Sequence, residues 1–365
     1  MMINPIIVLS LLSLALYNYF ISWIWRGLTK EQHKSTSSLS REQLPLTVII
    51  AAHNEENDIE QTLQSLLEQN YPVEKFEIIL AADRCSDSTV PIVHQLMNSF
   101  KNFTLIEINE VPTAYSPKKY AIESAIEMAK NRQYVFMDAD CTIHPNCLET
   151  FNKYFQSKYQ VVVSIPKIRS TSTLLYRYLL PERLATWGIC ASAIGFSKPF
   201  LAFGGLWGYT RQAYDTVGGM SDISHVLSGD DDLLIYMMGQ KKLPVVCCLN
   251  PEGWGETRMP QSIKTFFTQR RRHHSAGKFY GRKIQLGYLG YHISNLLLWI
   301  LPLLKPYLAI LLIIKFIVDF VLLLRLKGIF KENLNFIHLI SFEFGYLLQH
   351  VFIAPLSFLG KIHWK

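Results

Sequence analysis

Apolar stretches without charge occupy both ends of the chain. Residues 1–25 contain no Asp, Glu, Lys or Arg, and the run from Ile3 to Trp25 is long enough to cross a bilayer as a helix. Basic residues follow this run, beginning at Arg26, whereas a cleaved signal peptide carries its positive charge before the apolar run. The pattern predicts an uncleaved transmembrane anchor over residues 1–28, with the following residues in the cytoplasm.

Apolar runs return in the last quarter of the chain. Residues 284–304 carry no charge, the run from Pro306 to Leu324 is strongly apolar, and an aromatic-rich stretch follows a basic connector. We predict a C-terminal membrane region over residues 282–365 with two or three transmembrane helices, the last stretch being a span or a re-entrant or interfacial segment. Lys315 and Asp319 lie one helical turn apart, so they could pair on one helix face or serve a lipid head group.

The middle of the chain alternates short apolar runs with amphipathic segments. The runs are typical of buried strands, and the segments between them have helical spacing, with Asn54 as a candidate cap of the first helix. This alternation predicts an α/β fold, a doubly wound and mostly parallel sheet of the Rossmann-like kind covered by helices. Residues 29–44 are the expected linker and 45–281 the expected cytoplasmic domain. The predicted strands are 46–52, 76–82, 103–108, 134–137 and 161–165, with helices around 117–130 and 145–157.

Composition agrees with a chain that lies partly in a membrane. Only 18% of the 365 residues are charged, below the roughly 25% of soluble proteins, and 49% are hydrophobic. These values exclude disordered, collagen-like and disulfide-stabilised proteins, and the six cysteines are expected to be free thiols in a reducing compartment. The net charge of +7 suits nucleic acid, an anionic membrane or a phosphate-bearing substrate.

Carboxylates follow three of the predicted strands, at the end of the sheet where such folds bind ligands. Asp138 and Asp140 come directly after a strand and suit a divalent cation that is shared with phosphates, although a solvated loop pair is the alternative. Asp83 ends the second strand and could accept a hydrogen bond from a ribose or a base, or could cap a turn. Glu55, after the first strand, is open to the same interpretations.

Three further features could carry chemistry. The acids Asp230–Asp232 precede an apolar helix, where they could cap the helix or provide a general base. The basic run Gln269–His274 could contact anionic lipid, a diphosphate or nucleic acid, and the absence of a nucleic-acid-binding motif disfavours the last. Trp207 could pack in the core or form an aromatic wall for a sugar ring.

Six motifs in sequence order resemble those of the membrane-bound family 2 glycosyltransferases, which have the glycosyltransferase-A fold. The resemblance runs from about Thr47 to Lys278. The motifs are VIIAAHNEE (48–56), ADRCSD (82–87), PKKYAIESAI (117–126), DAD (138–140), GG…GDDDL (218–233) and QRRRH (269–273).

This resemblance implies an inverting, metal-dependent transfer of a sugar from a nucleoside diphosphate sugar. Asp83 matches the nucleoside-binding aspartate, with Glu55 and Lys119 around the same pocket. Asp138 and Asp140 match the D-x-D motif that holds Mg²⁺ or Mn²⁺ on the diphosphate, so Asp138 is also an expected donor contact.

The last two motifs, GG…GDDDL and QRRRH, imply roles for further site residues. Asp230 matches the catalytic base, with Gly229 where the family has glutamate. Gln269 and Arg272 match the donor-binding residues of Q-x-x-R-W, and His273 stands where tryptophan is expected. Trp207 and His273 are the expected acceptor contacts. A partly protonated histidine at 273 could assist Arg272 at the diphosphate, and it argues against processive synthesis.

These features predict a hexosyltransferase of the plasma (inner) membrane, multi-pass, with a cytoplasmic catalytic domain and a role in the cell envelope. It would move one sugar from a nucleoside diphosphate sugar to a lipid-linked or membrane-proximal acceptor, with membrane lipid as a partner and no nucleic acid. Two alternatives stay open: a processive polysaccharide synthase, and a catalytically inactive sugar-nucleotide-binding membrane module.

Overall fold

The computed structural model describes residues 4–34, 42–171, 173–260 and 262–356. The chain divides into two compact units that interleave along the sequence. The helical unit is drawn from Met1–Lys30, Thr171–Ser192 and Ser262–Lys361, and the sheet unit from Glu31–Ser170 and Ala193–Gln261. The expected domain 45–281 thus divides between them, because residues 171–192 and 262–281 pack with the helical unit.

A mostly parallel sheet forms the centre of the sheet unit. Its strands, among the described residues, follow the order β3-β2-β1-β4-β8-β6-β9, in which β8 alone runs antiparallel to its neighbours β4 and β6. A second sheet has the order β5-β10-β7. The strands are β1 Leu46–Ala52, β2 Phe76–Asp83, β3 Phe103–Ile108, β4 Gln133–Asp138, β5 Cys141–Ile143, β6 Val161–Val163, β7 Pro166–Ile168, β8 Leu206–Thr210, β9 Val245–Cys247 and β10 Gly255–Thr257.

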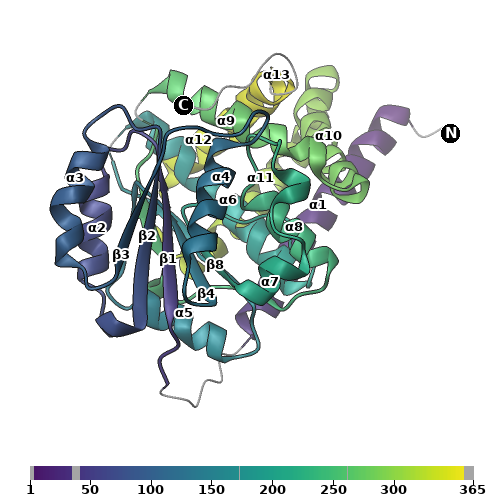
Figure 1. Cartoon of the computed structure of the whole chain (residues 1–365). Coiled ribbons are helices and arrows are strands. Elements are labelled where there is room, and N and C mark those ends of the chain that lie inside the picture. Colours follow the sequence, from purple (N-terminus) through teal and green to yellow (C-terminus); the bar gives the residue numbers. More distant parts are fainter. Residues whose placement is uncertain (1–3, 35–41, 172, 261, 357–365) are drawn as a thin grey trace. The chain divides into compact units, whose positions relative to one another are not determined.

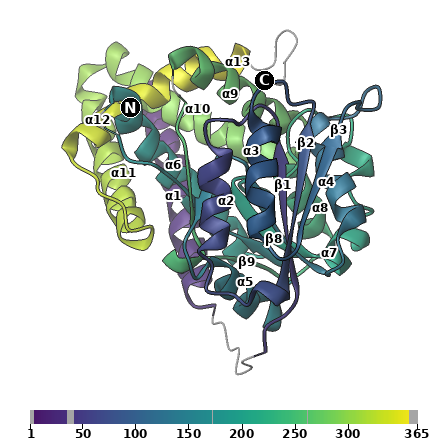
Figure 2. The ribbon, with the colours of Figure 1, turned by 60° about the vertical axis from the view of Figure 1, so that its left-hand side comes forward.

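Helices cover both faces of this sheet, which confirms the doubly wound α/β fold. Figures 1 and 2 show α2 and α3 along one face of β1 and β2, and α4 along the other. The apolar side chains of α4 pack on β1 and β2 because Ala121, Ile122, Ala125 and Ile126 form one buried stripe. The helices of the unit are α2 Ile59–Leu67, α3 Thr89–Leu96, α4 Pro117–Met128, α5 Cys147–Gln156, α7 Arg211–Thr216 and α8 Asp232–Gln240.

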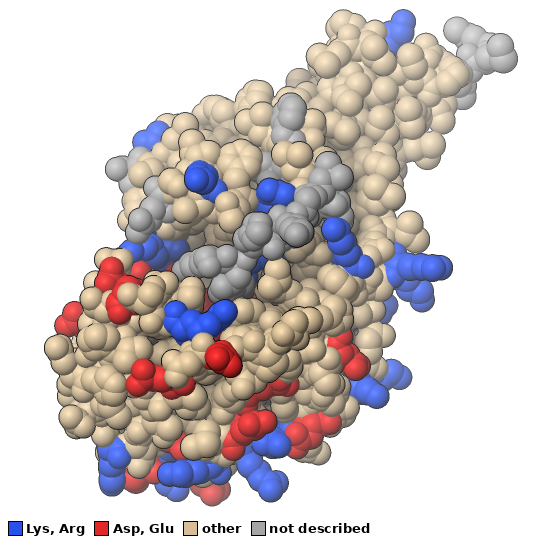
Figure 3. All heavy atoms as spheres, turned by 45° about the horizontal axis from the view of Figure 1, so that its top comes forward, with Lys and Arg blue, Asp and Glu red and all other residues tan. Residues whose placement is uncertain are grey.

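The helical unit contains helices able to cross a membrane. Within the described residues three are long and apolar enough to do so: Pro5–Gln32, Arg282–Leu304 and Pro306–Ile329. Many of their apolar side chains are exposed, and Figure 3 shows broad areas without a Lys, Arg, Asp or Glu side chain on the face that it draws. The helices of this unit are α1 Pro5–Gln32, α6 Leu174–Gly195, α9 Ile263–Ala276, α10 Arg282–Leu304, α11 Ala309–Ile329, α12 Phe336–Leu348 and α13 Ala354–Leu356.

The last apolar segment, predicted as a span or a re-entrant or interfacial segment, is helical of mixed type. The helix α12 continues directly into a π-helix, Gln349–Ile353, and then into α13, so the chain is helical over residues 336–356. The segment is not among the three candidate spans found in the part of the chain that the structure describes.

A buried ionic cluster joins three helices of the helical unit. Lys315 of α11 lies 2.9 Å from Asp319, as the spacing predicted, and also pairs with Glu343 of α12. The hydroxyl of Tyr17 on α1 donates to Asp319. One ammonium group is thus shared by two carboxylates in a region with little access to water.

Two local predictions are wrong. Asn54 does not cap the first helix, which begins at Ile59 after Asp58; its backbone is left-handed (φ 57°), and its side chain accepts the N–H of Ser86 instead. The predicted strand 161–165 is too long, because β6 ends at Val163, and the separate strand β7 after it pairs with β10 in the second sheet.

Candidate active site

The predicted site residues of the sheet unit gather at the carboxyl ends of the parallel strands. Asp83 and Asp138 are the last residues of β2 and β4, and Glu55 follows β1 in the loop to α2. Asp230 precedes α8, one residue before the N-cap Asp231. In a parallel sheet, these strand ends form the edge where ligands bind.

Lys118, at the start of α4, joins two of the carboxylates. Its Nζ lies 2.8 Å from Asp138 Oδ1 and 2.8 Å from Asp230 Oδ2. Burial alone would lower the pKa of Lys118, but the carboxylates of Asp138, Asp230 and Asp231 raise the pKa above its ordinary value. Lys118 is therefore charged and holds the end of β4 beside the start of α8.

Backbone groups hold the acidic turn in place. The carboxylate of Asp231 accepts the N–H of Gly204 at 2.6 Å and that of Asp232 at 2.7 Å. Burial, with the nearby charge of Asp230, raises the pKa of Asp231 to about 6. A Cβ added at Gly204 would lie 3.1 Å from Lys118 Nζ and 3.2 Å from Asp231 Oδ2, so glycine allows the backbone to approach both groups closely.

The backbone conformation of the turn explains why a glycine precedes Asp230. Gly229 has φ +81°, and a Cβ at this position would lie 2.6 Å from Leu233 Cγ. A glutamate, which the family pattern has here, would be strained in this backbone. Gly229, which replaces the glutamate of the family pattern, is therefore suited to the backbone of the turn that holds Asp230.

Lys119, predicted to lie around the donor pocket, makes its direct contacts with backbone carbonyl oxygens, although the charges of Asp230 and Asp231 act on it. Its side chain is fully buried, and its Nζ donates to the carbonyl oxygens of Ile223, Val226 and Ser228 at 2.9, 2.5 and 2.9 Å. Burial lowers the pKa of Lys119 to about 8. Lys119 supports the loop before Asp230, whereas its neighbour Lys118, which sequence reasoning missed, contacts the acids.

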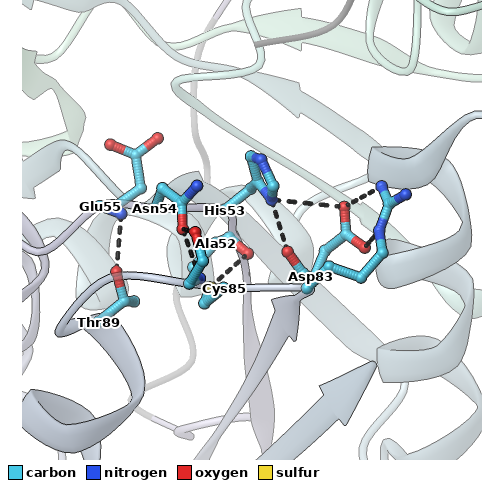
Figure 4. A network of polar contacts seen from close by, with 9 residues as sticks. Ala52, His53, Asn54, Glu55, Asp83, Cys85 and Thr89 are labelled. Carbon is cyan, nitrogen blue, oxygen red and sulfur yellow. Dashed lines mark hydrogen bonds and ion pairs between the residues drawn. The ribbon is translucent and has the colours of Figure 1, made fainter. Parts of the chain in front are cut away.

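A second polar network surrounds the end of β2 (Figure 4). His53 reaches across to Asp83, with 2.6 Å between Nδ1 and the backbone carbonyl oxygen, and Arg84 pairs with both Asp83 carboxylate oxygens at 2.8 and 3.0 Å. The Glu55 N–H donates to Thr89 at 2.7 Å, while the Glu55 carboxylate points away from that contact. The loops after β1 and β2 are thereby tied together beside a buried aspartate.

The D-x-D residues have the chemistry for a divalent cation. Asp138 has a side chain that is 36% exposed, and Asp140 is half-buried, so both are accessible to an ion. Over the described ranges, no group of three or more His, Cys, Asp or Glu residues could hold a metal ion by itself. Magnesium commonly takes one or two protein carboxylates plus substrate phosphates, so the present donor set fits an ion that arrives with a diphosphate.

Trp207 does not provide an exposed wall for an acceptor sugar. It lies on β8 opposite Phe136 of β4, and its side chain is only 2% exposed. The indole packs on Phe136 and Tyr209, with ring centroids 5.8 and 4.9 Å away. The core-packing alternative is the one that the structure shows.

The remaining predicted residues lie on α9 in the helical unit. Gln269 and Arg272 are half-buried, and Arg272 Nη2 lies 3.2 Å from His273 Nε2. Burial and the neighbouring arginines lower the pKa of His273 well below its ordinary value. Burial and the neighbouring positive charges thus oppose protonation of His273, whereas the sequence suggested a partly protonated histidine.

Comparison with known proteins identifies the family. Residues 47–218 match the model described as "Glycosyl transferase family 2", and residues 135–354 match "Glycosyl transferase family group 2". The second match covers more than half of the chain and extends through the helical unit.

Curated relatives carry related names but align over limited regions. "Probable glycosyltransferase YdaM" of Bacillus subtilis is 28% identical over 206 residues, 54% of this chain and 48% of the relative. "Glycosyltransferase AglE" of Haloferax volcanii is 27% identical over 104 residues, 28% of this chain and 33% of the relative. "Poly-beta-1,6-N-acetyl-D-glucosamine synthase" of Staphylococcus epidermidis is 30% identical over 154 residues, 40% of this chain and 33% of the relative. The chain spans one third to one half of the length of these relatives.

A solved structure shares the fold. The mannosyltransferase PcManGT from Pyrobaculum calidifontis, in complex with GDP-Man and Mn²⁺, aligns with a TM-score of 0.56 and 17% identity. The alignment covers 83% of this chain and 86% of that one. With the strand order, the carboxylates at the strand ends and the two family models, this places the chain among the family 2 glycosyltransferases of the glycosyltransferase-A fold.

Proposed function

We propose that the protein transfers a single hexose, with inversion, from a nucleoside diphosphate sugar to a lipid-linked or membrane-proximal acceptor. The observation that carries the proposal is the bridge from Lys118 to Asp138 and Asp230. It joins a D-x-D motif, suited to a metal diphosphate, to an aspartate suited to act as a base. An inverting transfer needs both functions at one site, since the acceptor oxygen loses a proton as the diphosphate departs.

Each residue of the site has a distinct role in this proposal. Asp230 accepts the proton of the acceptor hydroxyl, and Lys118, 2.8 Å away, holds its carboxylate in place. Asp138 and Asp140 would hold Mg²⁺ or Mn²⁺, which when bound offsets negative charge on the diphosphate. Asp83 and the network around it would bind the nucleoside, with Glu55 in the adjoining loop.

Two observations support a nucleoside diphosphate sugar as the donor. The structural neighbour PcManGT was solved with GDP-Man and Mn²⁺, and its fold covers most of this chain. The sheet unit also places carboxylates at the strand ends where such folds bind nucleotides.

The acceptor and the location follow from the helical unit. Three candidate spans favour a multi-pass protein of the plasma (inner) membrane, with membrane lipid around it. Arg26 and Lys30 lie at the end of the first span, which favours a cytoplasmic position for the residues that follow. An acceptor anchored in the same membrane would be held near the catalytic unit at high local concentration.

The direct test is a transfer assay with native membranes. Membranes that contain the protein are incubated with a panel of radiolabelled nucleotide sugars, and the lipids are extracted. We expect label from one donor in the lipid fraction, lost when Asp230 is replaced by asparagine. Label that reaches no lipid from any donor would contradict the proposed acceptor class.

Metal dependence gives a separate prediction. Chelation should abolish transfer, and added Mg²⁺ or Mn²⁺ should restore it, because the described residues supply too few ligands to retain an ion alone. Asp140→Ala should weaken donor binding only when metal is present, measured by calorimetric titration. Asp215→Ala, at an exposed aspartate of α7, is the matched control. Full activity in excess chelator would remove the D-x-D residues from the mechanism.

A processive synthase is the second candidate, because a relative named as a poly-beta-1,6-N-acetyl-D-glucosamine synthase is 30% identical over 154 residues. His273 supports single addition instead, since its smaller ring offers less surface to a sugar than the tryptophan of the family pattern. We expect product length to be independent of the donor-to-acceptor ratio, and His273→Ala to slow transfer without changing product size. A ladder of products that lengthens with donor excess, seen by mass spectrometry, would favour the synthase.

A further inference from the structure

Two helices of the helical unit, α6 and α9, carry a strong excess of positive charge. Their sequences contain a single acid, Glu182, which pairs with Arg270 through a 2.5 Å contact between Oε2 and Nη2. Arg270 is buried, and its guanidinium lies over the ring of Phe266. The basic residues of the two helices are Arg177, Arg183, Lys264, Arg270, Arg271 and Arg272.

Arg183 lies in this cluster without a carboxylate of its own. Among the described residues, its Nε is buried without a hydrogen-bond partner, as is the Nε of Arg270. Burial and then the positive charge of Arg270 lower the pKa of Arg183 to about 10, against the opposite effect of Glu182. A guanidinium with this pKa is still charged near pH 7, so two like charges share one carboxylate.

The positive charges of this cluster also act on a neighbouring histidine. The pKa of His273 is lowered by burial and then by Arg272, Arg270 and Arg183, which shows that these groups act on one another. Partly buried like charges destabilise a fold unless an opposite charge accompanies them. An anion bound at the cluster would supply that charge.

We propose that Arg183 and Arg270 bind the phosphate group of the lipid-linked acceptor. A guanidinium fork matches the geometry of phosphate oxygens, and arginine forms the stronger, two-point contacts with such groups. The cluster belongs to the same compact unit as the three candidate spans, so a phosphate anchored in the membrane is the ligand that this unit would meet. This inference rests on the proposed function, because it takes the acceptor to be a lipid.

The test measures binding rather than turnover, with the full chain in detergent micelles. The probes are a short-chain prenyl phosphate, the corresponding prenyl alcohol, and a nucleoside diphosphate with Mn²⁺. Arg183→Gln should weaken binding of the prenyl phosphate about tenfold to a hundredfold, since hydrogen bonds to charged groups have that magnitude, and should leave nucleoside diphosphate binding unchanged. Lys264→Gln removes the same charge from an exposed position of α9 and is the matched control, with no expected effect.

Several outcomes would overturn the inference. Equal affinity of the wild-type protein for prenyl phosphate and prenyl alcohol would do so, as would unchanged prenyl phosphate binding by a folded Arg183→Gln protein. Weakened binding of the nucleoside diphosphate alone would assign the cluster to the donor instead of the lipid. If Arg183→Gln does not fold, Arg183→Lys keeps the charge without the fork and should still weaken prenyl phosphate binding. The two hypotheses can also fail separately. If the wild-type protein transfers label to lipid but Arg183→Gln binds prenyl phosphate normally, this inference is contradicted and the proposed function is not.

Discussion

Replacement of Asp230 by asparagine should lower the rate of sugar transfer by about 10²–10⁴-fold while donor binding survives. Asparagine keeps the shape of the side chain but cannot accept the proton of the acceptor hydroxyl, and general-base catalysis contributes rate factors of about that size. The loss of one partner leaves Lys118 with Asp138, so the lysine is still paired. Initial rates with extracted lipid product, and titration of the nucleoside diphosphate, measure the two effects separately.

The neighbouring acids provide controls for this assignment. Asp231 accepts two backbone N–H groups, and Asp232 accepts the N–H of Ala202, so both are occupied in holding the turn. Asparagine at 231 or 232 should change thermal stability more than the chemical step. If either substitution abolishes transfer while Asp230→Asn is mild, the base is not Asp230.

Replacement of Lys315 by leucine should destabilise the protein by about 3–5 kcal/mol. Removal of one partner from a buried ionic cluster leaves uncompensated charge, and here the carboxylates of Asp319 and Glu343 would face each other without the ammonium group. Unfolding of the full chain in detergent, followed by heat or denaturant, is the measurement.

A combined variant distinguishes charge imbalance from lost packing. When Lys315→Leu is combined with Asp319→Asn and Glu343→Gln, the cluster becomes neutral and most of the lost stability should return, because neutral amides carry no buried charge. A triple variant as unstable as Lys315→Leu alone would show that the cluster contributes mainly through packing.

The order of strands and helices in the sheet unit was predictable because it depends on local patterns. Strands such as 46–52 and 103–108 are short, mainly apolar runs, and β1 and β3 have these bounds. Carboxylates at the ends of such runs must lie at one edge of a parallel sheet, so the run pattern alone was enough to place Asp83 and Asp138 there. The spacing of Lys315 and Asp319 likewise predicted their pair, since a helix brings such residues to one face.

Other features depend on partners far away in the sequence. No strand was predicted over residues 204–208, but β8 begins at Leu206 because β4 and β6 provide hydrogen bonds on both sides, and this buries Trp207. Helix α6 has apolar residues all around, which fits a helix enclosed by others, and its place in the helical unit follows from contacts such as that of Ser192 with Ile24.

The adjacent lysines Lys118 and Lys119 show most clearly the difference between what the sequence predicts and what tertiary packing decides. The motif resemblance predicted that Lys119, at the start of α4, lies around the donor pocket with Asp83. The local pattern does not distinguish the two lysines, since both precede the same buried stripe of Ala121, Ile122 and Ala125. Only the tertiary structure decided this: three carbonyl oxygens around residues 223–228 enclose Lys119, while Asp138 and Asp230 meet at Lys118. Asp138 lies 20 residues from Lys118 in sequence, but the carbonyl oxygens around Lys119 belong to residues 104 to 109 positions away. Packing of distant segments therefore decides which oxygens each flexible ammonium group contacts.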